Sequence, residues 1–278
     1  MEIIIANAQM DGHIMTTVVM ALSGGMDSTC LLMHYLSRGY RAICISYQYG
    51  QKHGIELERA SSTIHLCHSN ELDVQHHIVD LSPAMSLFDS ALTSEEQNVP
   101  EGHYEEDQMK QTVVPNRNAI FASILYGFAL SEAKRTNKEV VLALGVHSGD
   151  HAIYPDCRPE FYQALQGAFE VGNWDSEFVA FDLPYLHGDK TSILLDAMES
   201  TETLGLDFDT VLANTITSYN PDQYGRSSGK SGSDIERILA FHSIDRKDPI
   251  TYQDSWENVL EHALEVESQF KGGEHIES

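Results

Sequence analysis

The sequence predicts an α/β protein in which a doubly wound, mainly parallel sheet is followed by a helical subdomain. Short apolar runs alternate with segments of helical periodicity through the first two-thirds of the chain, which is typical of βαβ units. A glycine-rich turn separates the first apolar run from the first helical segment. After Tyr185 the pattern is helical only, and 278 residues exceed the usual size of one domain.

The expected elements follow one another along the chain. Runs of apolar or β-branched residues predict strands over 17–22, 41–47, 74–79 and 139–144. Helical periodicity predicts helices over 28–37, 56–68, 117–135, 190–198, 235–241 and 252–270. Polar, acidic composition predicts a loop over 94–112, and Ser- and Gly-rich composition predicts another over 220–234.

Three parts are expected: an N-terminal extension over 1–15, an α/β domain over 16–205 and a C-terminal helical subdomain over 206–278. The extension contains the apolar run 3–5, but no basic residues precede it, so we do not expect a signal peptide. It is either an additional short strand or a leader before a translation start at Met15.

Composition argues against several classes of partner. The 42 acidic and 17 basic residues give a net charge of −25, which disfavours binding to a nucleic-acid backbone. No apolar run approaches the ~18 residues of a membrane-spanning helix, so no membrane partner is expected. The four cysteines lie far apart in the sequence, and we interpret them as reduced thiols of a cytoplasmic protein.

The strongest functional signal is the segment S-G-G-M-D-S-T, residues 23–29, between the first strand and the first helix. Its glycines, Gly24 and Gly25, let backbone N–H groups approach a ligand, and a helix N-terminus favours an anion. The hydroxyls of Ser23, Ser28 and Thr29 add donors, so the segment predicts a phosphate site. The carboxylate of Asp27 would repel phosphate unless a cation bridged them, which indicates Mg²⁺. The alternative is an ordinary turn capped by Ser28.

Further motifs narrow the interpretation. The segments 47–53 (YQYGQKH), 114–118 (VPNRN), 154–158 (YPDCR) and 189–190 (DK) follow predicted strands or open predicted helices. With the glycine loop, their order and spacing resemble the QueC family of 7-cyano-7-deazaguanine synthases, over residues 18–220. These are PP-loop ATP pyrophosphatases. The resemblance therefore implies an adenine nucleotide alpha hydrolase-like, Rossmann-like fold and cleavage of ATP between its α- and β-phosphates.

The resemblance also implies roles for matched positions. Lys190 would neutralise charge on the pyrophosphate leaving group, and Arg117 would face the nucleotide or the carboxylate. The candidate catalytic residues are thus Asp27, Lys190 and Arg117. ATP and Mg²⁺ would be held by Ser23, Gly24, Gly25, Asp27, Ser28, Thr29, Gln51, His53 and Asn118. The deazaguanine would be bound by Asp150, Tyr154, Asp156 and Arg158.

These roles have structural alternatives. The alternative for Asp156 is a cap on a helix beginning near Pro159, and the alternative for Lys190 is a solvated helix start. His53 and His151 are as well explained by ordinary packing, because the chain has 14 histidines.

The sequence departs from the family at its zinc site. Where QueC proteins carry four cysteines, this chain has Ser218, Ser228, Ser231 and Asp234 at the corresponding positions. Three hydroxyls and a carboxylate are poor zinc ligands beside four thiolates, so no zinc is expected. The residues 150–153 (DHAI) also differ from the family's usual segment, so substrate details near them are open.

Three functions are compatible with this reading. In the first, the protein adenylates the carboxylate of 7-carboxy-7-deazaguanine, and ammonia converts it to the amide and then the nitrile. In the second, a member repurposed for bacterial antiphage defence (CBASS-type) joins the deazaguanine to an amine of a partner protein. In the third, the protein only binds nucleotide, against which the intact loop and Lys190 argue. The resemblance further implies a homodimer.

Overall fold

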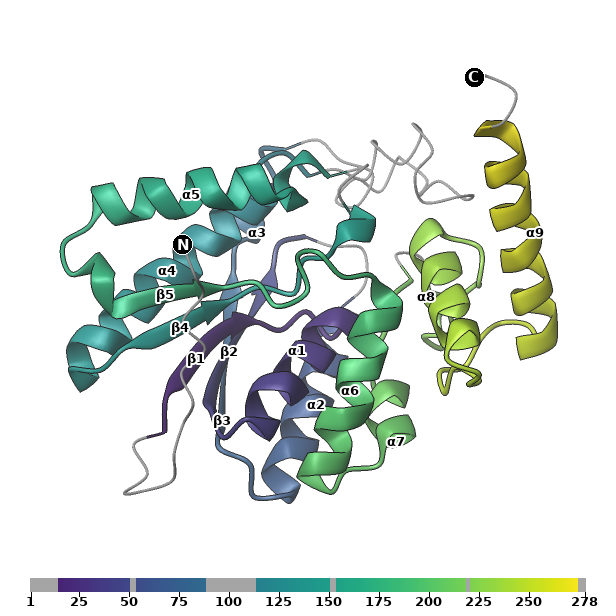
Figure 1. Cartoon of the computed structure of the whole chain (residues 1–278), viewed down its shortest axis with the longest axis horizontal. Helices are drawn as coiled ribbons and strands as arrows, with labels where there is room; N and C mark the ends of the chain where they lie inside the picture. The colour runs from purple at the N-terminus through teal and green to yellow at the C-terminus, as the bar shows by residue number, and fades with distance from the viewer. Residues whose placement is uncertain (1–14, 51–53, 89–113, 151–153, 219–220, 275–278) are drawn as a thin grey trace.

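A parallel sheet forms the centre of the described chain (Figure 1). The computed structural model describes residues 15–50, 54–88, 114–150, 154–218 and 221–274, with backbone only for 150 and 271–274. In the described part the strand order is β3-β2-β1-β4-β5, and every neighbouring pair is parallel. The strands are β1 (Thr17–Ala21), β2 (Arg41–Gln48), β3 (Val74–Asp80), β4 (Val140–Ala143) and β5 (Val179–Asp182). The predicted class is confirmed.

The first four strands match the predictions closely, whereas β5 is not predicted. A strand buried on both faces consists of apolar residues in sequence, as in β1 and β2. In β5 only Val179 is buried, and the strand is four residues long at the sheet edge. Such a segment carries too little apolar periodicity to be distinguished from a loop.

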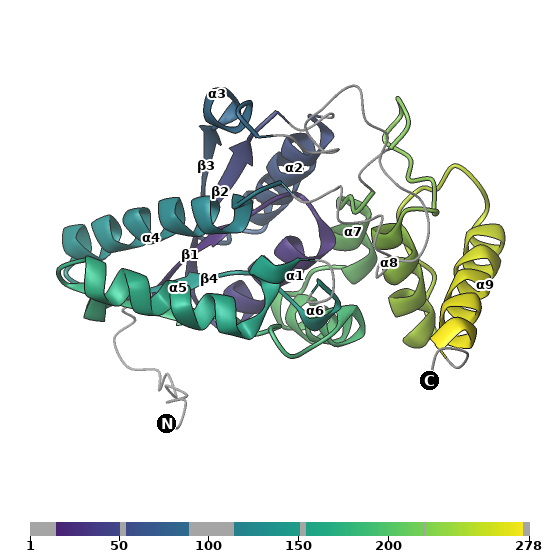
Figure 2. The ribbon, with the colours of Figure 1, turned by 90° about the horizontal axis from the view of Figure 1, so that it is seen from above.

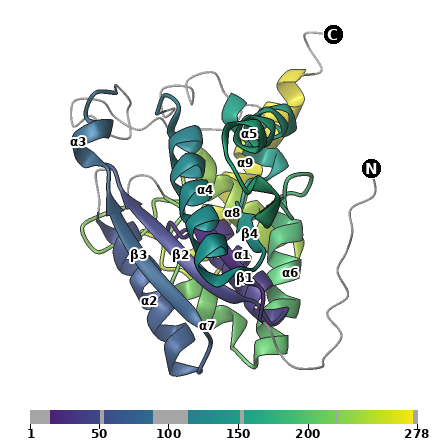
Figure 3. The same ribbon diagram turned by 90° about the vertical axis from the view of Figure 1, so that its left-hand side faces the viewer.

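Helices cover both faces of the sheet, as Figure 3 shows for α4 and α5 on one side and α2 and α6 on the other. The helices are α1 (Met26–Ser37), α2 (Ile55–Ser69), α3 (Ser82–Met85), α4 (Arg117–Thr136), α5 (Pro159–Gly172), α6 (Lys190–Leu204), α7 (Phe208–Ala213), α8 (Gly232–Ser243) and α9 (Trp256–Glu274). Alternate residues of β1 belong to different cores: Val18 and Met20 pack in the α1 layer, and Val19 packs in the α4 layer.

The C-terminal helices share the core of the sheet domain up to α8. Phe208 of α7 and Phe241 of α8 belong to the same buried cluster as α1 and α6. The α9 helix packs mainly against α8, through Val259 and Ala263, and it lies at the end of the molecule in Figures 1 and 2. The predicted boundary after residue 205 coincides with the left-handed Gly205 that ends α6, although the hydrophobic core continues across it.

A buried ion pair fastens α8 to the segment before α9. The guanidinium of Arg237 donates to both carboxylate oxygens of Asp248, at 2.7 and 2.9 Å, and both side chains are fully buried. Thr215 and Thr217 accept from the same guanidinium, and the hydroxyl of Tyr252 donates to Asp248 at 2.8 Å. Burial alone would lower the pKa of Arg237, but Asp248 holds it above the usual value.

Among the described residues, no helix combines the length and apolar character that crossing a membrane requires. The four cysteines, all in the described part, are buried and form no disulfide: Cys30, Cys44, Cys67 and Cys157. Residues 1–14 of the predicted N-terminal extension 1–15 and the predicted loop 94–112 lie outside the described residues.

Candidate active site at the carboxyl ends of β1, β2 and β4

A pocket of about 260 Å³ opens where β1, β2 and β4 end. Its walls include Leu22 after β1, Tyr47 of β2 and Gly145 after β4. β1 pairs with β2 on one side and with β4 on the other. After β1 the chain adds β2 and β3 on the first side and then adds β4 and β5 on the second, so the pocket lies at the point where the strand order reverses. Ligands of open α/β sheets bind at such points. Among the predicted site residues, its lining contains Ser23, Gly25, Asp27, Ser28, Arg117, Asn118 and Tyr154.

Gly24 fixes the position of the phosphate loop. Its φ of +83° lies in the left-handed region, and a Cβ there would collide with the carbonyl oxygen of Glu56 and lie 2.9 Å from the amide of Ala60. On its other side, the Gly24 carbonyl accepts from the Ile216 amide at 3.0 Å. The loop is therefore held between α2 and the segment after α7, and only glycine fits at this position.

The loop hydroxyls lie together at the start of α1. The Oγ atoms of Ser23 and Ser28 are 3.0 Å apart, and Ser28 Oγ donates to the Gly25 carbonyl at 3.3 Å. The N-cap residue is Gly25, without a side-chain cap, so the alternative that Ser28 caps α1 is wrong. An anion in the pocket would complete this helix start, because the first N–H groups of a helix lack partners within it.

Asp27 and Lys190 form the charged centre of the site. Lys190 Nζ donates to Asp27 Oδ2 at 3.0 Å and lies 2.9 Å from His147 Nε2. Burial would raise the pKa of the Asp27 carboxyl, but Lys190 and His147 hold it well below its usual value. Among the described residues, Asp27 Oδ1 is buried and has no hydrogen-bond partner. A buried anionic oxygen without a donor is suited to a cation, so the residues present fit Mg²⁺.

Lys190 is not the solvated helix start that was the alternative. The capping box of Asp189 and Ser192 begins α6, and Lys190 follows as its first residue. Its side chain is only 5% exposed and lies behind Asp27, outside the pocket lining. The structure thus places Lys190 next to the phosphate loop rather than in the pocket itself.

Two residues of this cluster, His147 and Glu236, are absent from the sequence prediction. His147 follows β4, and its position at the carboxyl end of a predicted strand is a signal that could have identified it. Glu236 comes from α8, and its Oε2 lies 3.3 Å from Lys190 Nζ. No local pattern marks Glu236, because only packing of α8 against α6 brings it to the loop.

The opposite wall of the pocket comes from α4 and the segment before α5. The Arg117 guanidinium stacks over the Tyr49 ring at 5.9 Å. Asn118 Nδ2 donates to the Asp156 carbonyl at 3.5 Å and lies 3.4 Å from Cys157 Sγ. The R-N motif therefore holds the Y-P-D-C-R segment, and with it Tyr154, at the edge of the pocket.

Asp156 does not cap α5, whose N-cap is Arg158 with no side-chain cap. Asp156 Oδ1 is buried without a hydrogen-bond partner in the described part of the chain, although Asp156 does not line the pocket. Its open acceptor is compatible with the predicted role toward a base.

Some predicted residues do not lie in the pocket. Thr29 is fully buried on the core side of α1, so its hydroxyl does not reach the pocket as expected. Arg158 is exposed and outside the lining, because it caps α5 at the surface. Gln51, His53 and the side chain of Asp150 lie outside the described residues.

The four positions of the family's zinc ligands gather around Asp234. The Asp234 amide donates to Ser231 Oγ at 3.2 Å, and Ser228 Oγ donates to Asp234 Oδ2 at 3.5 Å. Burial raises the pKa of the Asp234 carboxyl, and the hydroxyls of Ser231 and Ser218 oppose the rise. In the described ranges, no group of three or more His, Cys, Asp or Glu residues could hold a metal. Hydrogen bonds therefore connect these four positions, which a metal bound to four cysteine thiolates would otherwise connect.

We expect the purified protein to contain far less than one zinc per chain and to tolerate a chelator without unfolding. The physical reason is the weak affinity of hydroxyls for zinc compared with thiolates. Elemental analysis and thermal unfolding with and without chelator measure both properties. As a positive control, a variant with cysteine at positions 218, 228, 231 and 234 should acquire zinc. Stoichiometric zinc in the wild type would contradict the prediction.

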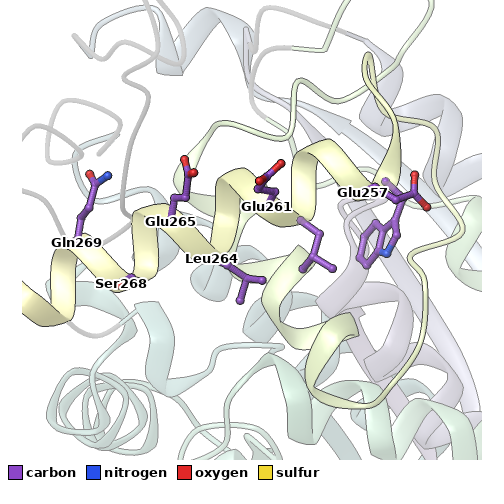
Figure 4. A pocket seen from close by; sticks show the side chains of 8 residues that line it. Glu257, Glu261, Leu264, Glu265, Ser268 and Gln269 are labelled. Atoms are coloured by element: carbon purple, nitrogen blue, oxygen red, sulfur yellow. The ribbon is translucent and has the colours of Figure 1, made fainter.

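A second hollow, about 1010 Å³ in volume, lies on the outer face of α9 and is shown in Figure 4. Trp256, Leu260 and Leu264 form its apolar part, and Glu257, Glu261 and Glu265 border it. All of its lining residues come from this one helix. Groups from different elements do not converge there, so the pocket beside the phosphate loop is the candidate active site.

Comparison with known proteins shows the family of the chain. The chain is 41% identical over 240 residues to 7-cyano-7-deazaguanine synthase 2 of Colwellia psychrerythraea (strain 34H / ATCC BAA-681), covering 86% of this chain and 99% of that protein. It is 42% identical over 235 residues to 7-cyano-7-deazaguanine synthase of Caldicellulosiruptor saccharolyticus, covering 84% and 95%. A 4-thiouridine synthetase–RNA complex with bound ATP has a TM-score of 0.43 at 17% identity, covering 89% of this chain and 53% of that one. The family described as queuosine biosynthesis protein QueC matches residues 17–245, and the chain belongs to this family.

Proposed function

We propose that the protein is an ATP-dependent carbon–nitrogen ligase that activates the carboxylate of 7-carboxy-7-deazaguanine and passes it to an amine. One observation carries the proposal. In a chain of the QueC family, the phosphate loop, Arg117, Asn118 and Tyr154 all line one pocket at the strand switch point. The order of events would be adenylation first and amine attack second.

In the first step, a carboxylate oxygen of the substrate attacks the α-phosphorus of ATP, and pyrophosphate leaves. Ser23, Ser28 and the start of α1 would bind phosphate oxygens, since their donors lie together at the pocket. Asp27 would hold Mg²⁺, which, when bound, neutralises phosphate charge. Lys190, beside Asp27, would stabilise charge on the leaving group.

In the second step, the amine nitrogen attacks the acyl carbon and AMP leaves. Arg117 would orient the carboxylate in the first step, because a guanidinium can bind both oxygens of a carboxylate. Asp156 and Asp150 are the candidates for the guanine-like edge, which presents an N1–H and a 2-amino group as donors. With ammonia, the product is the amide, and a second activation of its oxygen followed by loss of AMP gives the nitrile.

A protein amine is the alternative acceptor. The observation in its favour is the replacement of all four thiolate positions by Ser218, Ser228, Ser231 and Asp234, which sets this chain apart from the family pattern. A divergent member of this kind would attach the deazaguanine to a partner protein in bacterial antiphage defence.

Mass spectrometry of reaction products tests both acceptors. The purified protein is incubated with ATP, Mg²⁺ and 7-carboxy-7-deazaguanine, either with ammonia or with a protein encoded beside it. We expect AMP together with the amide or nitrile in the first reaction, or a mass increase of the partner in the second. Absence of AMP in both reactions would contradict the proposed ligase.

Asp156→Asn is expected to weaken binding of 7-carboxy-7-deazaguanine by about tenfold or more, which corresponds to ~1.4 kcal/mol. The substitution replaces an acceptor by a donor that opposes the donors of the base, and an unpaired buried polar group costs ~1–3 kcal/mol. Titration calorimetry measures the affinity, with Asp150→Asn in parallel and the exposed Glu160→Gln as a matched control. ATP affinity should stay unchanged. Unaltered base affinity in both Asp variants would place the base elsewhere.

A further inference from the structure

The Lys190 ammonium lies close to side chains from three different parts of the chain. Its Nζ lies 3.0 Å from Asp27 Oδ2, 2.9 Å from His147 Nε2 and 3.3 Å from Glu236 Oε2. The two carboxylates, Asp27 and Glu236, both form ion pairs with the ammonium. Lys190 is 5% exposed and lies outside the pocket lining, so an exchange of one of these contacts for a phosphate oxygen would connect it to the pocket.

The Glu236 carboxylate packs against the segment after β4. A Cβ at Gly149 would collide with Glu236 Oε1, so the missing side chain at residue 149 admits the carboxylate. The Gly149 amide also donates to His147 Nδ1 at 3.1 Å, which places the imidazole between the glycine and the lysine. Glu236 Oε1 lies 3.9 Å from the same His147 nitrogen. The Glu236 carboxylate, which comes from α8, therefore lies against Gly149 and His147 of the segment after β4.

Glu236 is the most replaceable of the three side chains around Lys190. Its contact with Lys190 is the longest, and its side chain is 22% exposed, whereas His147 is completely buried. Asp27 belongs to the phosphate loop and would be retained there to hold a cation. A second carboxylate beside one ammonium gives the cluster an excess of negative charge, which opposes the approach of another anion.

We propose that Glu236 is an internal counter-anion of Lys190 that the pyrophosphate end of ATP displaces, so that filling the phosphate site releases α8 from Lys190. This inference rests on the proposed ATP-dependent function and adds a regulation of the same site. Glu236 is a positioning residue in this scheme, because it acts through Lys190. Arg237, its neighbour on α8, stays anchored to Asp248, so release would concern the face of α8 toward the loop.

The test measures binding of inorganic pyrophosphate with Mg²⁺ by titration calorimetry. Glu236→Gln removes the competing charge and is expected to tighten pyrophosphate binding by about tenfold. Glu236→Asp keeps the charge and should stay close to wild type. The matched control is Glu261→Gln on the exposed face of α9, which changes the net charge equally and should leave the affinity unaltered.

Hydrogen exchange of the α8 amides provides the second readout. Pyrophosphate should accelerate exchange in α8 of the wild type, whereas in Glu236→Gln exchange should already be fast and should not respond. A purely structural role for Glu236 would lower the melting temperature without tightening pyrophosphate binding, and this would overturn the inference. Equal tightening by Glu261→Gln would overturn it as well. If the wild type bound no pyrophosphate, the proposed ATP site itself would fail, which separates the two outcomes.

Discussion

Lys190→Ala is expected to lower the rate of pyrophosphate release by about 10²–10³-fold, and Asp27→Asn by a similar factor. Lys190 is the positive charge hydrogen-bonded to the phosphate loop, at 3.0 Å from Asp27, and no uncharged side chain can neutralise a leaving pyrophosphate. Asp27→Asn removes the anionic oxygen that is suited to Mg²⁺ while keeping its shape. A coupled assay of pyrophosphate with ATP, Mg²⁺ and 7-carboxy-7-deazaguanine measures the rate.

The controls separate chemistry from folding. Lys247→Ala removes a lysine that is 63% exposed and should retain the wild-type rate. Both site variants should unfold cooperatively near the wild-type temperature, because the carboxylates around Lys190 keep partial access to water, at 26% for Asp27 and 22% for Glu236. Wild-type rates in Lys190→Ala and Asp27→Asn would show that ATP is not cleaved at this loop.

Arg237→Met is expected to cost about 3–5 kcal/mol of folding free energy, because it leaves the buried Asp248 carboxylate without its cation. For a chain of this size the melting temperature should fall by roughly 10 °C. Two threonine hydroxyls also lose their donor, Thr215 and Thr217. Thermal unfolding followed by circular dichroism measures the change.

The double variant Arg237→Met, Asp248→Leu is the informative control. Replacing both charges by apolar groups avoids an unpaired buried charge, so part of the lost stability should return. A melting temperature within about 2 °C of the wild type for Arg237→Met alone would contradict the prediction. The pair would then be surrounded by more water than its complete burial indicates.

Local patterns identified most of the fold and the phosphate loop. β1 and β2 are buried on both faces, so their apolar runs predict strands without any knowledge of their neighbours. The S-G-G-x-D-S segment likewise predicts its own conformation, because Gly24 requires a left-handed backbone and a close approach to α2. The same local reasoning does not distinguish which hydroxyls of the loop face the pocket, and Thr29 is on the wrong side of α1.

By itself, the sequence determined the fold class, the phosphate loop and the likeness to the QueC family, since each depends on residues adjacent in the chain. Tertiary structure alone decided the partners of Lys190. His147 and Glu236 reach its ammonium only because the sheet and α8 bring separate segments within hydrogen-bonding or ion-pairing distance. It also decided that Ser218 lies at Asp234, whereas the contact of Asp234 with Ser231 is local, because Ser231 is the N-cap of the helix that contains Asp234. The strength of a charge interaction depends on the distance between the two groups in space. The fold sets that distance, and the order of residues along the chain does not give it.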